Sequence, residues 1–427
     1  MRSIFFYGLL ISILVSCNSQ KQIGKAARKD VYNNKTLRSA HVGISIFEPA
    51  SGRYWYNYQG DKYFVPASNT KIPTCYAAMK YLGDSLIGLR YTRQGNSLFV
   101  LPAGDPSFLH PDFSRQPVID FLKNESADTI FWTNQYFKDE ALGSGWSWND
   151  YMQDYMAERS AFPIYGNLVT IKDSANTTPK IFINRATFTS EPKGYRITRD
   201  LAGNFTAVES ARKFTPTAIP FVTHPNFISQ SLGSIIHKNV LTHDSFFKKL
   251  SVNNLIHSQP TDSILKPMMH RSDNFFAEQS LLMVSNEMLG MMNDAAIIDT
   301  ILKTDFKDLP QKPRWVDGSG LSRYNLFSPQ DLVAILDKMQ KEFGMDRIRE
   351  IFATGNEGTL NNYYKTAQGA IFAKTGTLSG VVALSGFLFT KKNRMLIFSV
   401  LVNNHQASAS EVRRAVEKFI LQLKDEY

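Results

Sequence analysis

The hexapeptide PASNTK at residues 66–71 is the stretch on which the prediction of the fold and of the chemistry rests. The segment that follows carries apolar side chains at helical spacing, so we expect a helix over Lys71–Leu82 with one face suited to burial. Ser68 and Lys71 then lie three residues apart at the helix N-terminus, within side-chain reach of each other. A serine becomes a nucleophile when a base removes its proton. A lysine can be that base when burial or a second cation lowers its pKa.

This SxxK pattern alone does not establish a catalytic site. An N-cap serine followed by a solvated lysine would give the same letters. Average composition also yields roughly one or two such matches in a chain of 427 residues. The interpretation therefore depends on two further motifs.

The second motif is Ser272-Asp273-Asn274, which precedes a predicted helix over Asn274–Leu289. The Ser272 hydroxyl can pass a proton toward a leaving nitrogen, and the Asn274 amide can orient Lys71 and a substrate backbone. All three residue types are also good helix N-caps. Taken singly, the motif fits a cap as well as it fits a catalytic site.

The third motif is Lys374-Thr375-Gly376-Thr377, placed at the end of a strand predicted over Ala370–Ala373. Lys374 would supply a fixed positive charge, and Thr375 and Thr377 would supply hydroxyls for a substrate carboxylate. Gly376 lacks a side chain, so a substrate can approach the strand edge closely. An exposed strand terminus would explain this motif taken by itself.

The order of the three motifs is what gives them weight. Each lies on the element that its chemistry requires, and three weak matches in a fixed order are far rarer by chance than any one. The set is a signature of penicillin-binding proteins and class A β-lactamases. We therefore interpret the chain as a serine enzyme that forms an acyl intermediate on Ser68.

Strand patterns lie at both ends of the chain, with helices and a long insert between them. This order predicts an α+β fold in which an antiparallel sheet, flanked by helices, brings the first and last strands together. Ser328 is the expected cap of one of these helices. The elements expected outside the motifs are His41–Phe47, Tyr54–Tyr56, Pro329–Phe343, Val381–Phe389, Met395–Val402 and Ser408–Leu423.

The middle of the chain has a different pattern of predicted secondary structure. Short strand patterns at residues 129–133, 168–172 and 180–184 alternate with Gly, Pro, Ser and Asn clusters, and the first long helical pattern is Phe227–Lys238. We expect one or two inserted, smaller, mostly β lobes. The predicted organisation is a discontinuous catalytic domain, residues 36–84 and 251–427, interrupted by inserted domains at residues 85–250.

The N-terminus has the pattern of an export signal. The apolar run Ile4–Val15 is too short to span a bilayer and is typical of a signal-peptide core. It ends in Leu14-Val15-Ser16-Cys17, which resembles a bacterial lipobox. We expect residues 1–16 to be a lipoprotein signal peptide, Cys17 to carry a lipid anchor, and residues 17–35 to form a tether. A plain secretory signal with an incidental Cys17 is the alternative.

Composition excludes several function classes. The net charge of +10 fits either attraction to an anionic surface or a dispersed solvated face. No dense Lys/Arg run, zinc-finger spacing or RNP motif supports nucleic-acid binding. Cys17 and Cys75 are the only cysteines, so a lipidated Cys17 leaves no internal disulfide. Cys75 has the pattern of a buried apolar residue. No cysteine pair or HExxH helix supports a metal site.

The chain resembles the D-alanyl-D-alanine carboxypeptidase/endopeptidase family of class C (S13-type) penicillin-binding proteins. The resemblance implies a serine DD-peptidase/β-lactamase-like domain whose insert carries one or two extra domains. Much of the stretch Ser174–Thr217 is too short for a full third domain, so we expect a reduced one. Pro73, which has no N–H donor, departs from a regular helix and puts the geometry beside Lys71 in question. The blocks that carry the resemblance are residues 66–71, Gly104-Asp105-Pro106, Trp146–Asp150, Met269–Asn274, Asp317–Arg323 and Val402–Asn404.

The resemblance also implies a mechanism on peptidoglycan stem peptides. Ser68 attacks the carbonyl between two D-alanines while Lys71 takes its proton, and the backbone N–H groups of Ser68 and Thr377 hold the oxyanion. Ser272, supported by Lys374, protonates the leaving D-alanine. Cleavage of a cross-link by the same steps gives endopeptidase activity.

Further partners follow from the same resemblance. β-Lactams are expected to acylate Ser68 because they mimic the scissile dipeptide. Arg323 is expected to line the substrate cleft. The mechanism needs no metal or organic cofactor. Asn18 after the lipidated cysteine, rather than Asp, favours anchoring on the periplasmic side of the outer membrane over the inner one.

Three alternative functions can each be compared with the residues that they would require. A serine β-lactamase would share the nucleophile, but no convincing Glu-x-x-x-Asn loop lies between the first two motifs. A catalytically silent wall-binding lipoprotein would be expected to lose Ser68 or Lys71, and both are present. An α/β-hydrolase is disfavoured because the sequence has no GxSxG elbow.

Overall fold

The computed structural model describes residues 22–35, 37–173, 176–180, 182, 186–190, 196–201, 205–209, 217–247 and 250–427. The predicted signal peptide and Cys17 lie outside these residues. Within this part of the chain, each helix is too short or too polar to cross a bilayer.

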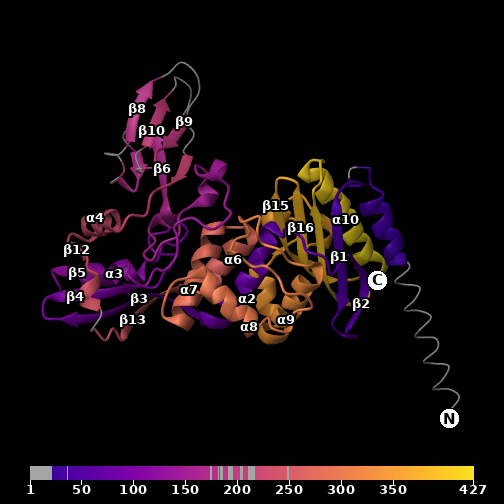
Figure 1. Ribbon diagram of the computed structural model, residues 1–427, viewed down its shortest axis with the longest axis horizontal. Helices are drawn as coiled ribbons and strands as arrows, with labels where there is room; N and C mark the ends of the chain where they lie inside the picture. The colour runs from indigo at the N-terminus through magenta and orange to yellow at the C-terminus, as the bar shows by residue number, and fades with distance from the viewer. Residues whose placement is uncertain are drawn as a thin grey trace, which may run out of the picture.

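A six-stranded antiparallel sheet joins the two ends of the chain, in the order β14-β15-β16-β17-β1-β2. β1 pairs with β17 from His41 opposite Asn403 to Phe47 opposite Ile397, so the indigo and gold strands of Figure 1 lie side by side. The predicted meeting of first and last strands is confirmed. The strands are β1 (His41–Glu48), β2 (Arg53–Tyr58), β14 (Ala353–Thr354), β15 (Ile371–Leu378), β16 (Val381–Phe389) and β17 (Met395–Asn403).

Helices cover both faces of this sheet, which explains why β16 and β17 are almost continuously apolar. Side chains alternate between the two faces of a strand. Phe387 and Leu401 therefore pack into one core with α2, α7 and α9, while Leu384 and Val400 pack into a second core with α10. The flanking helices are α2 (Lys71–Tyr81), α6 (Asp262–His270), α7 (Asn274–Leu289), α8 (Asp294–Lys303), α9 (Pro329–Ile351) and α10 (Ala409–Glu426).

A capping residue marks the start of α9, but its end differs from the prediction. The Ser328 hydroxyl accepts a hydrogen bond of 3.0 Å from the Asp331 N–H, which confirms Ser328 as the cap of α9. α9 does not end at Phe343 as predicted. Gly344 adopts a φ of 75°, and the chain bends there and continues to Ile351.

The predicted tether is wrong for residues 22–32. Residues 22–27 are α-helical and continue into η1 (Arg28–Tyr32), a segment that packs against α10. Ile23, Ala27 and Val31 are fully buried, and Lys418 of α10 lies 2.7 Å from Asp30. These apolar residues recur every fourth position, a helical period that the polar composition around them concealed. This segment therefore belongs to the folded domain.

The insert is built on a five-stranded sheet of order β12-β5-β4-β3-β13. β13 pairs with β3, so the insert sheet extends to Pro260, past the predicted boundary at residue 250. Prediction missed α3 because eight residues are too few for a clear helical period. The elements are β3 (Ser85–Gln94), β4 (Ser97–Pro102), α3 (Pro117–Asn124), β5 (Thr129–Trp132), α4 (Pro225–Ile236), β12 (Asn239–Thr242), α5 (Asp244–Phe247) and β13 (Asn254–Pro260).

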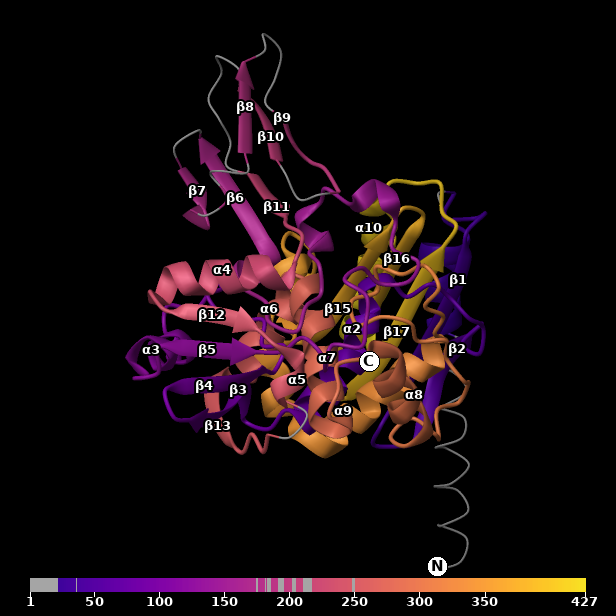
Figure 2. The same ribbon diagram turned by 60° about the vertical axis from the view of Figure 1, so that its left-hand side comes forward.

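Two three-stranded sheets complete the insert, and the outer one stands apart at the top of Figures 1 and 2. The strand predicted over residues 180–184 is wrong where the structure describes it. Lys180 and Phe182 lie in a 3₁₀ turn, because Phe182 packs inward against Phe221 and Phe227. The strands are β6 (Leu168–Asp173), β7 (Asn176–Thr178) and β11 (Thr217–Pro220) in one sheet, and β8 (Ala186–Ser190), β9 (Arg196–Arg199) and β10 (Phe205–Glu209) in the other.

Candidate active site

Ser68 and Lys71 project from the start of α2. The chain enters this helix through η2 (Ala67–Thr70), a 3₁₀ turn in which Ala67 has a φ of 46°. Lys71 Nζ lies 3.1 Å from Ser68 Oγ; Lys71 is fully buried, and Ser68 is only partly so. Pro73 falls in the first turn, where backbone N–H groups have no intrahelical partner, so α2 runs unbroken from Lys71 to Tyr81.

The SDN motif sits where α6 gives way to α7. Asp273 caps α7, because its carboxylate accepts a hydrogen bond of 3.0 Å from the Phe276 N–H. Asp273 is therefore the cap of α7. Its neighbours Asn274 and Ser272 hydrogen-bond Lys71 and Lys374 instead. Asn274 Oδ1 accepts a hydrogen bond of 2.6 Å from Lys71 Nζ, and Ser272 has a φ of 64°.

Lys374 reaches the same place from β15. Its Nζ donates to Ser272 Oγ and to the Thr375 carbonyl, both at 2.9 Å. Its own carbonyl accepts a hydrogen bond of 2.9 Å from the buried amide of Asn69, which ties β15 to η2. The motif does not end a strand as predicted. β15 continues to Leu378, so all four motif residues are strand residues.

Beyond Ala373, no strand of the described part of the chain pairs with the edge of β15 beside Ser68. β14 pairs only with Phe372 and Ala373, and β15 then continues from Lys374 to Leu378. Gly376 makes the close approach to η2 possible, because a Cβ there would lie 2.6 Å from the Pro66 carbonyl oxygen and 3.1 Å from Ser68 N. The predicted role for Gly376 was approach by a substrate; the structure shows approach by the backbone of the nucleophile itself.

The loop Asp317–Gly320 completes the environment of Lys71, and sequence reasoning gave it no role. The Ser319 carbonyl accepts a hydrogen bond of 2.7 Å from Lys71 Nζ. Asp317, fully buried, fixes the loop by accepting from Gly320 N at 2.8 Å and from Trp146 Nε1 at 3.0 Å. The sequence does predict a turn here, since an Asp-Gly-Ser-Gly stretch is typical of a tight turn. Nothing in the sequence placed that turn beside Lys71.

Burial sets the charge state of both lysines. Desolvation lowers the pKa of Lys71 to about 8, against the opposing attraction of Asp317, Glu278 and Asp273. Desolvation, Lys71 and Arg413 together hold the pKa of Lys374 well below its ordinary value. Burial beside Lys71 and Arg413 therefore opposes the positive charge that we expected on Lys374.

Two predicted substrate-binding residues lie at the far end of β15, Thr377 on the strand and Arg323 beside it. Thr377 is exposed, and its hydroxyl accepts a hydrogen bond of 2.7 Å from Arg413 Nη2. Arg323 donates from Nη2 to the Ser379 carbonyl at 3.0 Å, so it lies beside the end of β15 rather than in contact with the two lysines. Arg413 was missed because its helix looks like an ordinary amphipathic C-terminal helix in the sequence.

The insert braces this site. The Asn274 amide donates to the Tyr155 carbonyl at 3.0 Å. Arg159, also from the insert and almost fully buried, pairs with Asp294 at 2.5 Å and lies 3.6 Å from Glu278. Glu278 in turn accepts a hydrogen bond of 2.7 Å from Ser319 N. A continuous chain of contacts thus joins the insert to the loop that holds Lys71.

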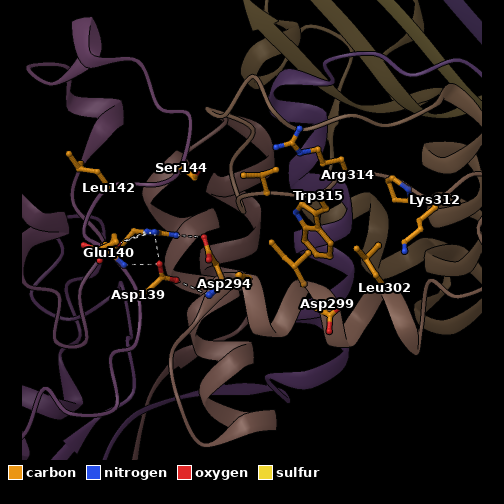
Figure 3. A pocket seen from close by; sticks show the side chains of 15 residues that line it. Asp139, Glu140, Leu142, Ser144, Asp294, Asp299, Leu302, Lys312, Arg314 and Trp315 are labelled. Atoms are coloured by element: carbon orange, nitrogen blue, oxygen red, sulfur yellow. Dashed lines mark hydrogen bonds and ion pairs between the residues drawn. The ribbon is translucent and has the colours of Figure 1, made fainter.

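Two pockets differ in their relation to this chemistry. One of about 680 Å³ lies between the insert segment around Asp139 and the helix that carries Asp294, and Figure 3 shows Trp315 on its far wall. None of Ser68, Lys71, Ser272 and Lys374 lines it. The other, of about 260 Å³, is lined by the SDN motif. Ser272 and Asn274 line this smaller pocket, whereas Ser68, Lys71 and Lys374 line neither pocket.

Among the described residues, no three His, Cys, Asp or Glu side chains are grouped so that they could hold a metal ion.

Comparison with known proteins gives one family and several relatives. The family model described as D-Ala-D-Ala carboxypeptidase 3 (S13) matches residues 26–198 and 230–423. A D-alanyl-D-alanine carboxypeptidase of Haemophilus influenzae is 24% identical over 84% of this chain and 85% of its own. A D-alanyl-D-alanine carboxypeptidase of an Actinomadura species is 24% identical over 89% of this chain and 80% of its own.

Solved structures with the same fold include penicillin binding protein 4 of Haemophilus influenzae. It has a TM-score of 0.74 at 19% identity, with 94% of this chain and 98% of that chain covered. A predatory endopeptidase of Bdellovibrio bacteriovorus, solved acylated by penicillin G, has a TM-score of 0.53 at 14% identity, with 90% and 93% covered. The predicted DD-peptidase-like fold is confirmed by the first of these structures.

Gly320→Ala tests the contact between the Asp317–Gly320 loop and η2. Gly320 has a φ of 84°, and a Cβ there would lie 2.0 Å from the Ala67 carbonyl oxygen. The matched control is Gly52→Ala, because Gly52 has a φ of 66° and nothing within 4 Å. We expect Gly52→Ala to lower the free energy of unfolding by about 1–2 kcal/mol through backbone strain alone. Gly320→Ala should cost about 1–3 kcal/mol more, measured by urea denaturation; equal losses would contradict the close packing.

Proposed function

Because the chain belongs to the D-Ala-D-Ala carboxypeptidase 3 (S13) family, we propose that it is a penicillin-binding serine D-Ala-D-Ala carboxypeptidase that acts through an acyl-enzyme on Ser68. Its substrates are peptidoglycan stem peptides that end in D-alanyl-D-alanine. The observation that carries the proposal is the position of Lys71 Nζ, 3.1 Å from Ser68 Oγ and enclosed by Asn274 Oδ1 and the Ser319 carbonyl.

Neutral Lys71 has the geometry of a general base. An uncharged lysine carries two N–H donors and one lone pair. The two donors match the two carbonyl acceptors, at 2.6 Å on Asn274 and 2.7 Å on Ser319. The lone pair is then left for the Ser68 hydroxyl, so the proton passes from Ser68 Oγ to Lys71 Nζ as the C–O bond forms.

The remaining groups serve the tetrahedral intermediate. Backbone N–H groups of Ser68 and Thr377 bind the oxyanion, and Gly376 keeps these two segments in close contact. Ser272 donates its proton to the leaving amine as the C–N bond breaks, and Lys374, 2.9 Å away, replaces it. Water then attacks the ester and the acyl–Oγ bond breaks. Lys71 returns its proton to Ser68 Oγ, and the proton lost by the water passes through Ser272 to Lys374, which restores the starting state. When the leaving amine belongs to a cross-link, the same steps give endopeptidase cleavage.

Export and anchoring complete the proposal. We infer that residues 1–16 direct export, and that Cys17 becomes a lipid-modified N-terminus on the periplasmic side, with the outer membrane favoured by Asn18. The folded domain starts by residue 22, close behind Cys17. A lipidated enzyme would therefore be held near the bilayer surface.

Replacement of Ser68 tests the nucleophile. After incubation with benzylpenicillin, the wild-type protein should gain the mass of one penicillin, and Ser68→Ala should gain none. Ser51→Ala, which removes an exposed serine from the turn between β1 and β2, should label like the wild type. The adduct should persist for minutes or longer, whereas a β-lactamase would release it within milliseconds. Intact-mass spectrometry decides between these outcomes, and an adduct on Ser68→Ala would contradict the assignment.

The pKa of Lys71 predicts how acylation depends on pH. Lys71 acts as a base only when neutral, and its pKa of about 8 lies below the ordinary 10.5. The second-order rate of acylation by benzylpenicillin should therefore rise about tenfold per pH unit below pH 8 and level off above it. Stopped-flow measurements from pH 6 to 9.5, with a melting curve at each pH as the control, would check this. A rate independent of pH would contradict a lysine base.

Removal of Cys17 tests the anchor. In a Gram-negative host, the full chain should partition into detergent, and its mass should show a lipid on an N-terminal cysteine. Cys17→Ala should lose both properties, because no thiol remains to carry the lipid. Cys75→Ala, which removes a buried thiol on α2, is the matched control and should behave like the wild type. Wild-type protein in the aqueous phase without lipid would disprove anchoring.

A further inference from the structure

Arg413 brings a positive charge to the edge of β15 from a part of the chain that none of the three motifs includes. It lies in the second turn of α10, and its Nη2 donates a hydrogen bond of 2.7 Å to the Thr377 hydroxyl. Side chains alternate along a strand, so Thr375 and Thr377 share one face of β15 and Lys374 points to the other. Thr375 and Arg413 also line one small pocket under α10.

The guanidinium of Arg413 has no anionic partner in the described part of the chain. The salt bridges formed there do not include Arg413, whereas Arg414 beside it pairs with Glu417 at 2.6 Å. Arg413 Nε is buried and has no acceptor. A guanidinium has five N–H donors, and buried donors without acceptors are costly. Arg413 is therefore a half-buried cation whose bonding is incomplete.

Two buried lysines lie near Arg413. Lys374 and Lys71 are both fully buried nearby, and the charge of Arg413 contributes to the lowered pKa of Lys374. The acidic groups that act on Lys71 are Asp317 in its loop, Glu278 on α7 and Asp273, the N-cap of α7. Arg413, which hydrogen-bonds Thr377 and keeps a buried Nε without an acceptor, therefore makes this edge of β15 favourable for an anion.

The mechanism fixes where a substrate would present an anion. The oxyanion is bound by the Thr377 N–H, so the scissile carbonyl lies beside Thr377. In a D-alanyl-D-alanine peptide, the free carboxylate is one residue beyond that carbonyl, at most about 3.8 Å farther along the chain. The backbone N–H of Thr377 therefore binds the oxyanion, and its hydroxyl lies beside the carboxylate. Arg413 donates a hydrogen bond to that hydroxyl.

We propose that Arg413 is a specificity-determining residue that binds, together with Thr377, the free C-terminal carboxylate of the substrate. The proposal rests on the proposed function and adds to it the recognition of the terminal carboxylate. Guanidinium and carboxylate form a strong charge-assisted pair. β-Lactams carry a carboxylate next to the reacting amide, so the same residue governs their binding.

The experiment compares benzylpenicillin with its methyl ester, which has the same reactive amide but no negative charge. Acylation rates are measured for the wild type and for Arg413→Gln, Arg413→Lys and Arg414→Gln. Arg414→Gln is the matched control, because it removes the same charge one residue away from an exposed side chain that already has a partner. Melting temperatures establish that each variant is folded.

Arg413→Gln should lower the acylation rate with benzylpenicillin by roughly 10- to 100-fold and change the rate with the ester by less than about twofold. Arg413→Lys should recover part of the loss, and Arg414→Gln should change neither rate by more than about twofold. An equal loss on both compounds, or no loss with benzylpenicillin, would overturn the proposal. If Arg413→Gln does not fold, Arg413→Lys tests the proposal instead, because its acylation rate must fall more with the free acid than with the ester. If neither compound acylates the wild-type protein, the proposed function itself is contradicted.

Discussion

A single buried amine holds the candidate site together. Lys71 Nζ lies within 3.1 Å of oxygen atoms from three segments: Ser68 on η2, Asn274 on α7 and the carbonyl of Ser319. A fully buried ammonium is unfavourable unless its surroundings compensate. Here the compensation is incomplete, and the pKa of Lys71 falls to about 8. Burial thereby makes the uncharged amine, the form that can accept a proton, accessible near neutral pH.

The rest of the molecule can be understood as support for this arrangement. The six-stranded sheet places β15 beside η2, and the insert contributes Trp146 and Arg159 to the loop and helices around Lys71. The Arg159–Glu278–Ser319 contacts cross from the insert to the catalytic part of the chain. The insert therefore has a structural role at the site in addition to any role in binding the cell wall.

The sequence predicted the catalytic residues better than it predicted the residues that surround them. Ser68, Lys71, Ser272, Asn274 and Lys374 are brought together as the motif order implied, because each motif carries its own local signal. The roles of Ser319 and Arg413 depend on tertiary contacts with no local signal. Likewise, the burial of Ile23 depends on α10, nearly four hundred residues away, so a polar segment looked like a tether.

A crystal structure of the benzylpenicillin adduct is the most direct test of the central claim. We predict an ester on Ser68 Oγ, with its carbonyl oxygen within hydrogen-bond distance of the N–H groups of Ser68 and Thr377, and Lys71 Nζ still bound to Asn274. An ester on another residue would contradict the account. So would a carbonyl turned away from β15, or a Lys71 side chain that had left Asn274.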